Sequence, residues 1–278
     1  MTGRERAART SRATDGTTAP EGFTKGAETY DEAVRHNIAG SDRLVMSFPE
    51  GGYRRVLDVG CGTGWTSAAM VRRFGVEEIV AVDASEGMLE RFAAKLGSEF
   101  PDVRVELRTE DVMAMGVPDG TFDAVLCAMA LHWFPDKPGA VARMARALRP
   151  GGVMGILTAG RGGEDAWREL LERVGAPAEW TGWFAANQRD VDEIAADLRA
   201  AGLEPLDVWM ERRRRHTDPG AFMARTRAVA AHLLGNPPGG FSDLDQRIER
   251  ALHDAAGPDG FVYDYCKLHA IARAPEPV

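Results

Sequence analysis

The chain has 278 residues, of which 44% are hydrophobic and 27% are charged, and this globular composition excludes a wholly disordered protein. The 34 basic and 42 acidic residues give a net charge of -8, which argues against long-range attraction to nucleic acid or to an anionic membrane. No apolar run reaches the roughly 18 to 20 residues of a membrane span, so we expect a soluble protein. Cys61, Cys127 and Cys266 match no zinc or disulfide spacing, which favours a reducing cytoplasm and no metal.

The first 23 residues are rich in Arg, Thr, Gly and Ala and lack the apolar core of a secretory signal. We therefore expect residues 1–23 to form a disordered tail. Residues 24–48 show mixed helical periodicity, with apolar side chains such as Tyr30 and Phe48 available to pack. This segment predicts one or two helices before the main part of the domain.

From Arg54 onward, short apolar runs typical of strands alternate with helical stretches. The pattern predicts strands at 54–60, 78–83, 103–111, 122–130 and 153–159, separated by helices at 66–74, 85–100 and 138–148. Ser85 is expected to cap the second of these helices. Five strands in this alternation indicate an α/β fold with a doubly wound sheet.

Beyond Gly160 the pattern predicts helices at 165–174, 190–201, 222–234 and 243–256, and further strands at 203–218 and 261–275. No linker separates these elements from the sheet. The sequence therefore predicts a single domain over 24–278, in which residues 24–50, 176–188 and 219–257 cover a ligand site.

A strand that runs into a glycine-rich turn, VLDVGCGTG at 56–64, is the most informative segment. Such a turn needs small residues when a ligand lies directly against the backbone. The spacing is G-x-G-x-G, whereas a dinucleotide fingerprint is G-x-G-x-x-G. Asp58 precedes the first glycine by two residues and would repel a pyrophosphate but attract a cation. The loop thus favours a ligand with an ammonium group, and the alternative is a turn without a ligand.

Two further acids follow the next strands of the predicted sheet. Asp83 ends the second strand, where an acid can accept hydrogen bonds from both ribose hydroxyls. Asp111 follows the third strand and could accept from an adenine amino group. Because no basic residue complements these acids, the pocket suits a positively charged ligand that contains a nucleoside. S-adenosylmethionine is such a ligand.

The motifs VLDVGCGTG, VDAS, EDV, FDAVLCAMALHWFPD and LRPGGVM resemble those of class I S-adenosylmethionine-dependent methyltransferases, over about Tyr30 to Thr158. Within that superfamily they are similar to small-molecule enzymes of the ubiquinone/menaquinone-biosynthesis and trans-aconitate type. The resemblance implies a Rossmann-like seven-stranded sheet whose last strand is antiparallel. It also implies S-adenosylmethionine as cofactor, S-adenosylhomocysteine as product, and no metal.

The resemblance further implies a role for each motif residue. Asp58 would lie near the ammonium, Asp83 would bind the ribose, and the glycine loop would contact the methionine part. Ala84, Met88, Asp111 and Val112 would contact the adenine, and the segment from Ala128 to Leu131 would pass under the sulfonium. The complete donor set is Asp58, Gly60, Cys61, Gly62, Gly64, Asp83, Ala84, Met88, Asp111, Val112, Ala128 and Leu131.

A sulfonium is already an activated methyl donor, so the protein must mainly hold the acceptor in line and exclude water. His132, just after the fourth strand, is the candidate catalytic base. Alternatively, it orients the acceptor or donor by hydrogen bonding, or it packs in the turn. Cys61 as a nucleophile is an alternative to its being a small residue in the loop.

Aromatic residues in the flanking segments are candidates for contact with an apolar acceptor, although each could instead be a buried aromatic. These residues are Tyr30, Trp133, Trp183 and Phe184. The basic run Arg212 to Arg215 is interpreted as a solvated charge run, with binding of an anionic acceptor as the alternative.

The sequence therefore predicts methyl transfer to oxygen or carbon of a small metabolite, in secondary metabolism. The alternatives are a catalytically silent S-adenosylmethionine-binding protein and an N-methyltransferase that acts on an amine. Asn236-Pro237-Pro238 is similar to a motif of enzymes that methylate bases, but no aromatic follows it and it comes after the sixth strand. We therefore expect no nucleic-acid or membrane partner. The acceptor and the oligomeric state do not follow from the sequence.

Overall fold

The computed structural model describes residues 19–33, 35–234 and 243–276, which fall into two compact units. The sheet unit contains the described residues within 36–159, 189–211 and 267–276. The helical unit contains those within 19–35, 160–188 and 212–266. Most of the segments predicted to cover the ligand site therefore belong to the helical unit, while residues 36–50 belong to the sheet unit. The prediction of one domain over 24–278 stays a prediction.

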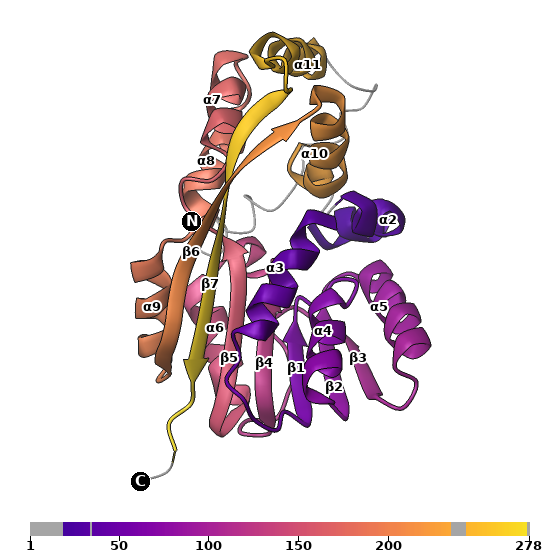
Figure 1. Cartoon of the computed structure of the whole chain (residues 1–278), viewed down its shortest axis with the longest axis vertical. Coiled ribbons are helices and arrows are strands. Elements are labelled where there is room, and N and C mark those ends of the chain that lie inside the picture. The colour runs from indigo at the N-terminus through magenta and orange to yellow at the C-terminus, as the bar shows by residue number, and fades with distance from the viewer. Residues whose placement is uncertain (1–18, 34, 235–242, 277–278) are drawn as a thin grey trace. The chain divides into compact units, whose positions relative to one another are not determined.

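Seven strands form one sheet in the order β3-β2-β1-β4-β5-β7-β6 (Figure 1). Strands β1 to β5 pair in parallel, and β7 is antiparallel to β5. This arrangement confirms the Rossmann-like sheet with an antiparallel last strand. The strands are β1 (Arg55–Val59), β2 (Glu78–Asp83), β3 (Arg104–Thr109), β4 (Phe122–Ala128), β5 (Leu148–Ala159), β6 (Glu204–Thr217) and β7 (Phe261–Arg273).

Helices cover both faces of the sheet in the sheet unit. Alternate residues of a strand point to opposite faces, so Val56 and Leu57 of β1 belong to two different apolar cores. The core that contains Val56 is closed by α3 (Arg35–Met46), α4 (Trp65–Phe74) and α5 (Glu86–Glu99). The core that contains Leu57 is closed by α6 (Lys137–Ala147) and α9 (Val191–Ala200). Strands apolar on both faces are typical of such a parallel sheet.

Polar caps set the first turns of several of these helices. The hydroxyl of Ser85 accepts from the N–H of Met88 at 3.3 Å, as the sequence predicted. Asp190 and Glu193 form a capping box at the start of α9. Such caps satisfy N–H groups that have no partner within the helix.

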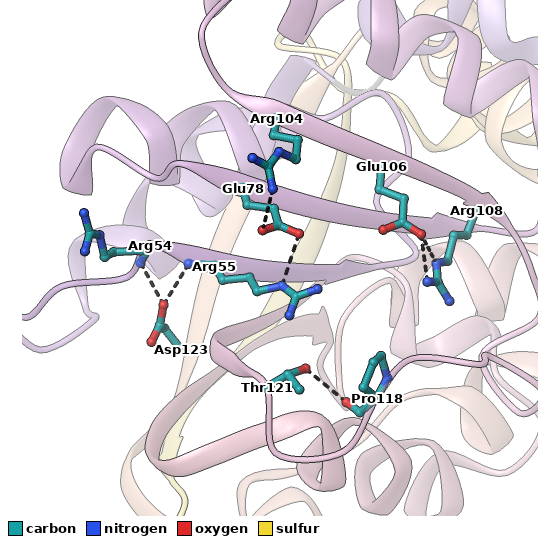
Figure 2. Close-up of polar contacts among 9 residues, drawn as sticks. All are labelled: Arg54, Arg55, Glu78, Arg104, Glu106, Arg108, Pro118, Thr121 and Asp123. Atoms are coloured by element: carbon teal, nitrogen blue, oxygen red, sulfur yellow. Dashed lines mark hydrogen bonds and ion pairs between the residues drawn. The ribbon is translucent and has the colours of Figure 1, made fainter.

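Polar and ionic contacts connect neighbouring strands at their amino-terminal ends (Figure 2). The Asp123 carboxylate accepts from the N–H groups of Arg54 and Arg55 at 2.9 and 2.7 Å. Glu78 pairs with Arg55 at 3.2 Å and with Arg104 at 3.7 Å. These contacts join β1, β2, β3 and β4 across the edge and leave the carboxyl ends of the strands to the loops.

The helical unit has its own apolar core, which includes Trp167, Phe222 and Tyr263. The guanidinium of Arg225 lies over the rings of Phe222 and Tyr263 and donates to the Tyr263 hydroxyl. In addition, α2 packs against α10. The helices of this unit are α2 (Ala19–Ala33), α7 (Asp165–Arg173), α8 (Ala178–Asn187), α10 (Pro219–Leu234) and α11 (Asp243–Ala255).

Three local expectations need correction. Helix α2 begins at Ala19, so residues 19–23 are helical instead of part of a tail, and Pro20 is tolerated because it lies in the first turn. Helix α8 lies in the predicted cover segment 176–188 but was not among the predicted helices, since Gly182 and the aromatic residues around it are weak helix formers. Strand β5 begins at Leu148, because a register irregularity opposite 122–124 accommodates the proline-glycine turn within the strand.

None of the helices in the described part of the chain has the length and apolar character that crossing a membrane requires. Residues 1–18 and the Asn236-Pro237-Pro238 segment lie outside the described residues.

Candidate functional site

The glycine loop at 60–64 joins β1 to α4, and three of its glycines have left-handed backbone. Gly60, Gly62 and Gly64 have φ values of 65°, 53° and 86°, which side-chain-bearing residues rarely adopt. A Cβ on Gly60 would overlap the Cβ of Ala130, and one on Gly64 would come within 2.8 Å of α5 side chains. By contrast, nothing lies within 4 Å of a Cβ on Gly62. The loop backbone at Gly62 is therefore open to a ligand.

Asp58 places a buried carboxylate two residues before this loop. Its side chain is 1% exposed, and the Ser67 hydroxyl donates to Oδ2 at 2.7 Å. The other oxygen, Oδ1, is buried and has no hydrogen-bond partner among the described residues. Burial raises the pKa of this carboxyl to about 7, opposed by the Ser67 hydrogen bond and assisted by the charge of Asp83. A buried acceptor without a donor is costly, and an ammonium ligand would satisfy it.

Asp83, the last residue of β2, ties the loop to the neighbouring strand. Its Oδ2 accepts from the Gly62 N–H at 2.9 Å and its Oδ1 accepts from the Ser85 N–H at 2.9 Å. Burial raises the pKa of Asp83, while these backbone hydrogen bonds lower it. Each carboxylate oxygen can accept more than one hydrogen bond, so capacity remains for ligand hydroxyls.

In the segment after β3, two acidic side chains accept hydrogen bonds from backbone N–H groups of the same segment. Asp111 is exposed, and its Oδ1 accepts from the Met113 N–H at 2.7 Å. Glu110 accepts from the Gly116 N–H at 2.8 Å. Val112 is 5% exposed and belongs to the apolar core. The acid predicted for the adenine edge is therefore accessible, whereas the predicted apolar contact lies largely within the core.

The turn after β4 is strained and packs on the glycine loop. Met129 has a φ of 55°, which costs a residue with a side chain on the order of 1 to 3 kcal/mol. Its N–H donates to the Leu157 carbonyl at 2.6 Å. Ala130 packs closely against Gly60, so this turn and the glycine loop are in direct contact.

His132 lies in the short helix η1 (Leu131–Trp133) that completes the turn. Its side chain is 5% exposed, and its Nδ1 lies 3.2 Å from Oγ1 of Thr158, which is fully buried. The ring centroid of His132 lies 4.9 Å from that of Trp133. The imidazole is therefore held by a specific polar contact in addition to packing.

The sheet unit brings most predicted site residues to the carboxyl edge of β1 to β4. Tyr30 belongs to the helical unit, where its ring meets Phe23 edge-on at 6.0 Å. Trp183 and Phe184 belong to α8 of the same unit, and their side chains lie outside the described part of the structure. The residues gathered at the edge are Asp58, Gly60, Cys61, Gly62, Gly64, Asp83, Ala84, Met88, Asp111, Val112, Ala128, Leu131, His132 and Trp133.

Cys61 does not have the environment of a nucleophile. Its side chain is 8% exposed and its thiol contacts the Gly62 carbonyl at 3.7 Å. Burial first, and then the charges of Asp83 and Asp58, raise the pKa of the thiol well above its usual value. The thiol is thus protonated at neutral pH, which supports its interpretation as a small residue of the loop. Within the described residues, no group of His, Cys, Asp and Glu side chains could hold a metal ion.

The arginine run is engaged by another strand of the helical unit. Arg212 and Arg214 pair with Asp264 at 3.4 and 3.1 Å, with arginine side chains 56% and 69% exposed. Arg215 lies over the ring of Tyr265. This arrangement supports the interpretation as a solvated charge run.

Two polar residues at the site were missed by sequence reasoning. Ser67 holds Asp58, and a signal for it exists, because Ser67 is a polar residue on the apolar side of α4. Thr158 contacts His132, but a threonine in a strand is too common to single out.

Comparison with known proteins identifies the family. A family model described as a methyltransferase domain matches residues 56–152. A malonyl-[acyl-carrier protein] O-methyltransferase of Magnetococcus marinus is 34% identical over 234 residues, which are 82% of this chain and 81% of that protein. The chain belongs to the S-adenosylmethionine-dependent methyltransferases.

A second relative matches a shorter part of this methyltransferase. The trans-aconitate 2-methyltransferase of Deinococcus radiodurans is 36% identical over 134 residues, which are 48% of this chain. The match spans 49% of that relative, about half of its length.

Solved structures share the fold of the methyltransferase. A structure from Bacillus halodurans described as a methyltransferase covers 85% of this chain and 99% of its own, with a TM-score of 0.63 and 19% identity. A phosphoethanolamine N-methyltransferase of Haemonchus contortus, in complex with S-adenosylhomocysteine, covers 94% of this chain and 61% of its own, with a TM-score of 0.58 and 18% identity. At these identities the likeness supports the fold.

Proposed function

We propose that this methyltransferase binds S-adenosylmethionine at the carboxyl edge of its sheet and transfers the methyl group to a small molecule, on oxygen or carbon. The observation that carries the proposal is the buried Oδ1 of Asp58, which has no hydrogen-bond donor among the described residues. Asp58 lies two residues before the glycine loop, whose backbone is open at Gly62. A cationic ligand against this loop satisfies the carboxylate and fills the open space.

Each part of the donor has a matching group in the chain. Asp58 binds the ammonium, the Gly62 backbone contacts the methionine part, and Asp83 accepts from the ribose hydroxyls. Asp111 accepts from the adenine amino group. Contacts from Gly60, Cys61, Gly64, Ala84, Met88, Val112, Ala128 and Leu131 complete the donor site.

The sulfonium supplies an electrophilic methyl group when the cofactor is bound. The task of the chain is to hold the acceptor atom in line with the S–CH₃ bond and to exclude water, which can lower the barrier by up to about 7 to 11 kcal/mol. His132 contacts the acceptor from the turn after β4, and Trp133 contributes an aromatic face. Tyr30, Trp183 and Phe184 stay proposed acceptor contacts of the helical unit.

The acceptor class is supported by the relatives and by charge. The two relatives described above are named for acidic substrates, one a small acid and the other an acid linked to a carrier protein. The second is named an O-methyltransferase. The net charge of -8 does not favour nucleic acid. Oxygen is therefore the preferred acceptor atom, with carbon as the second choice.

The experiment is incubation of the purified full chain with methyl-labelled S-adenosylmethionine and an extract of small metabolites. We expect a labelled small product, identified by mass spectrometry, and none after boiling. Tight donor binding without any labelled product would indicate a silent binding protein. A labelled amine would place the methyl group on nitrogen and contradict the proposed acceptor atom.

A further inference from the structure

The hydroxyl of Thr158 is a buried polar group in contact with the ring of His132. Thr158 is fully buried, and its Oγ1 contacts Nδ1 of His132 at 3.2 Å. Its register partner on β7 is Leu268, which is also buried, and the surrounding core is apolar. Among the described residues, Nδ1 of His132 is the hydrogen-bond partner that the structure gives this hydroxyl.

A hydroxyl in such a place must donate its proton. If Nδ1 carried the proton and donated to Oγ1, the hydroxyl hydrogen of Thr158 would be buried without an acceptor, which is unfavourable. If Oγ1–H donates to Nδ1, the hydroxyl is satisfied, and Nδ1 must carry a lone pair. A neutral imidazole has one proton, so that proton then lies on Nε2.

We propose that Thr158 is a positioning residue that holds His132 as a neutral ring with its proton on Nε2, so that His132 donates a hydrogen bond to the acceptor instead of removing a proton from it. The inference rests on the proposed function and decides between two roles that the sequence left open for His132. A ring protonated on Nε2, with Nδ1 engaged by Thr158, has no lone pair available to act as a base.

The acceptor class follows from this tautomer. Without a base at this position, the acceptor must arrive without a proton to lose, as a carboxylate does. One carboxylate oxygen forms the O–CH₃ bond while the S–CH₃ bond breaks, and the electron pair of the broken bond goes to sulfur. The products are a methyl ester and a neutral thioether, so no proton is released. The N–H of Nε2 orients the carboxylate by a charge-assisted hydrogen bond.

The tautomer can be measured without knowing the acceptor. Nitrogen NMR of histidine-labelled full-length protein with S-adenosylhomocysteine bound reports which ring nitrogen carries the proton, and the His132 signals are those missing in H132Q. We expect the proton on Nε2 in the wild type and in T158S. In T158V, the Nδ1 resonance should shift toward that of a nitrogen without a hydrogen bond.

Two results would overturn the inference: a proton on Nδ1 in the wild type, or an Nδ1 resonance that is the same in T158V as in the wild type. If T158V does not fold, the wild-type and T158S spectra still decide the tautomer. Failure to bind S-adenosylhomocysteine in calorimetry would instead defeat the proposed function, so the two failures are distinguishable.

Kinetics with trans-aconitate and catechol as probes test the role of the ring. The amide of glutamine places an N–H donor near the position of Nε2 but cannot act as a base. We therefore expect H132Q to keep methyl transfer to trans-aconitate within about tenfold of the wild type, and H132A to lose more. A general base accelerates a reaction by about 10²- to 10⁴-fold. Equal losses of activity in H132Q and H132A would therefore contradict the proposal. Methyl transfer to catechol without methyl transfer to trans-aconitate would contradict it as well.

Discussion

Asp58 is a buried carboxyl group whose ionisation would change on binding of the proposed ammonium ligand. Burial raises its pKa to about 7, although the Ser67 hydroxyl donates to one of its oxygens. Among the described residues, the other oxygen has no hydrogen-bond donor. A bound ammonium favours the ionised form, so donor binding must displace a proton from any protein molecule in which Asp58 is protonated. The proposed contact between Asp58 and the ammonium therefore predicts an affinity for the methyl donor that is sensitive to pH in the neutral range.

We expect the affinity for S-adenosylhomocysteine to be about tenfold weaker at about pH 6 than at about pH 8, since most Asp58 is protonated at the lower pH. Isothermal calorimetry at several pH values measures this dependence. The D58N variant should bind more weakly and lose most of the dependence. An affinity in the wild type that does not change with pH would show that Asp58 does not meet the ammonium.

Asp83 provides a second test at the scale of one residue. Replacing it by alanine removes the proposed ribose acceptor and the anchor of the Gly62 N–H. We expect D83A to weaken S-adenosylhomocysteine binding by about 1 to 3 kcal/mol in calorimetry. The matched control is D136A, which removes the cap of α6 in the same unit and should cost about 1 kcal/mol of stability without changing the affinity. Equal affinities of D83A and the wild type would remove Asp83 from the site.

At the scale of elements, the two ends of α4 offer a matched pair of glycines. Gly62 lies before the helix and Gly75 ends it, with φ values of 53° and 66°. A Cβ has nothing within 4 Å at either position. Backbone strain should therefore be similar at the two sites, while only Gly62 lies in the glycine loop that we propose binds the methyl donor.

We expect G62A and G75A each to lower the free energy of unfolding by about 1 kcal/mol, because alanine is strained in left-handed backbone. Only G62A should weaken S-adenosylhomocysteine binding, since its methyl group would occupy the ligand side of the loop. Denaturant unfolding and calorimetry separate the two effects. A weaker affinity in G75A as well would mean that strain in α4, and not contact with the ligand, is responsible.

Much of the element order could be predicted because each signal is local. Ser85 marks the start of α5, and the apolar run of β2 was predicted with the bounds that the structure has. The α8 helix was missed because its Trp, Thr and Gly residues have weak helix propensity. Its helical state therefore depends on surroundings that no local pattern describes.

At the scale of the whole molecule, the ionisation of Asp58 makes the free energy of unfolding depend on pH. The pKa of the Asp58 carboxyl rises from 3.8, the ordinary value for an exposed aspartate in an unfolded chain, to about 7 in the folded protein. Between these values the native state binds more protons than the unfolded state, so the free energy of unfolding falls as pH rises through this window. Asp83 and Glu164, whose pKa values are also raised by burial, act in the same direction.

We expect D58N to gain stability relative to the ligand-free wild type as pH rises from about 4 to about 7, by up to about 4 kcal/mol. The neutral amide has no charge to bury, so it avoids this cost. Urea unfolding of both proteins across the range measures the difference. A constant difference between them would mean that the carboxyl is ionised throughout, contrary to the raised pKa.

The sequence by itself determined the family, the parallel sheet and the acids at the strand ends, because glycine spacing, apolar alternation and residues such as Asp83 act within a short stretch of chain. Only the tertiary structure decided which partners those groups have. Thr158 meets His132 across 26 positions because β4 and β5 are neighbours in the sheet. Within the described part of the chain, one buried oxygen of Asp58 has no hydrogen-bond donor. Contacts and desolvation of this kind depend on how distant segments pack, and it is packing that sets the proton positions on which the proposed chemistry depends.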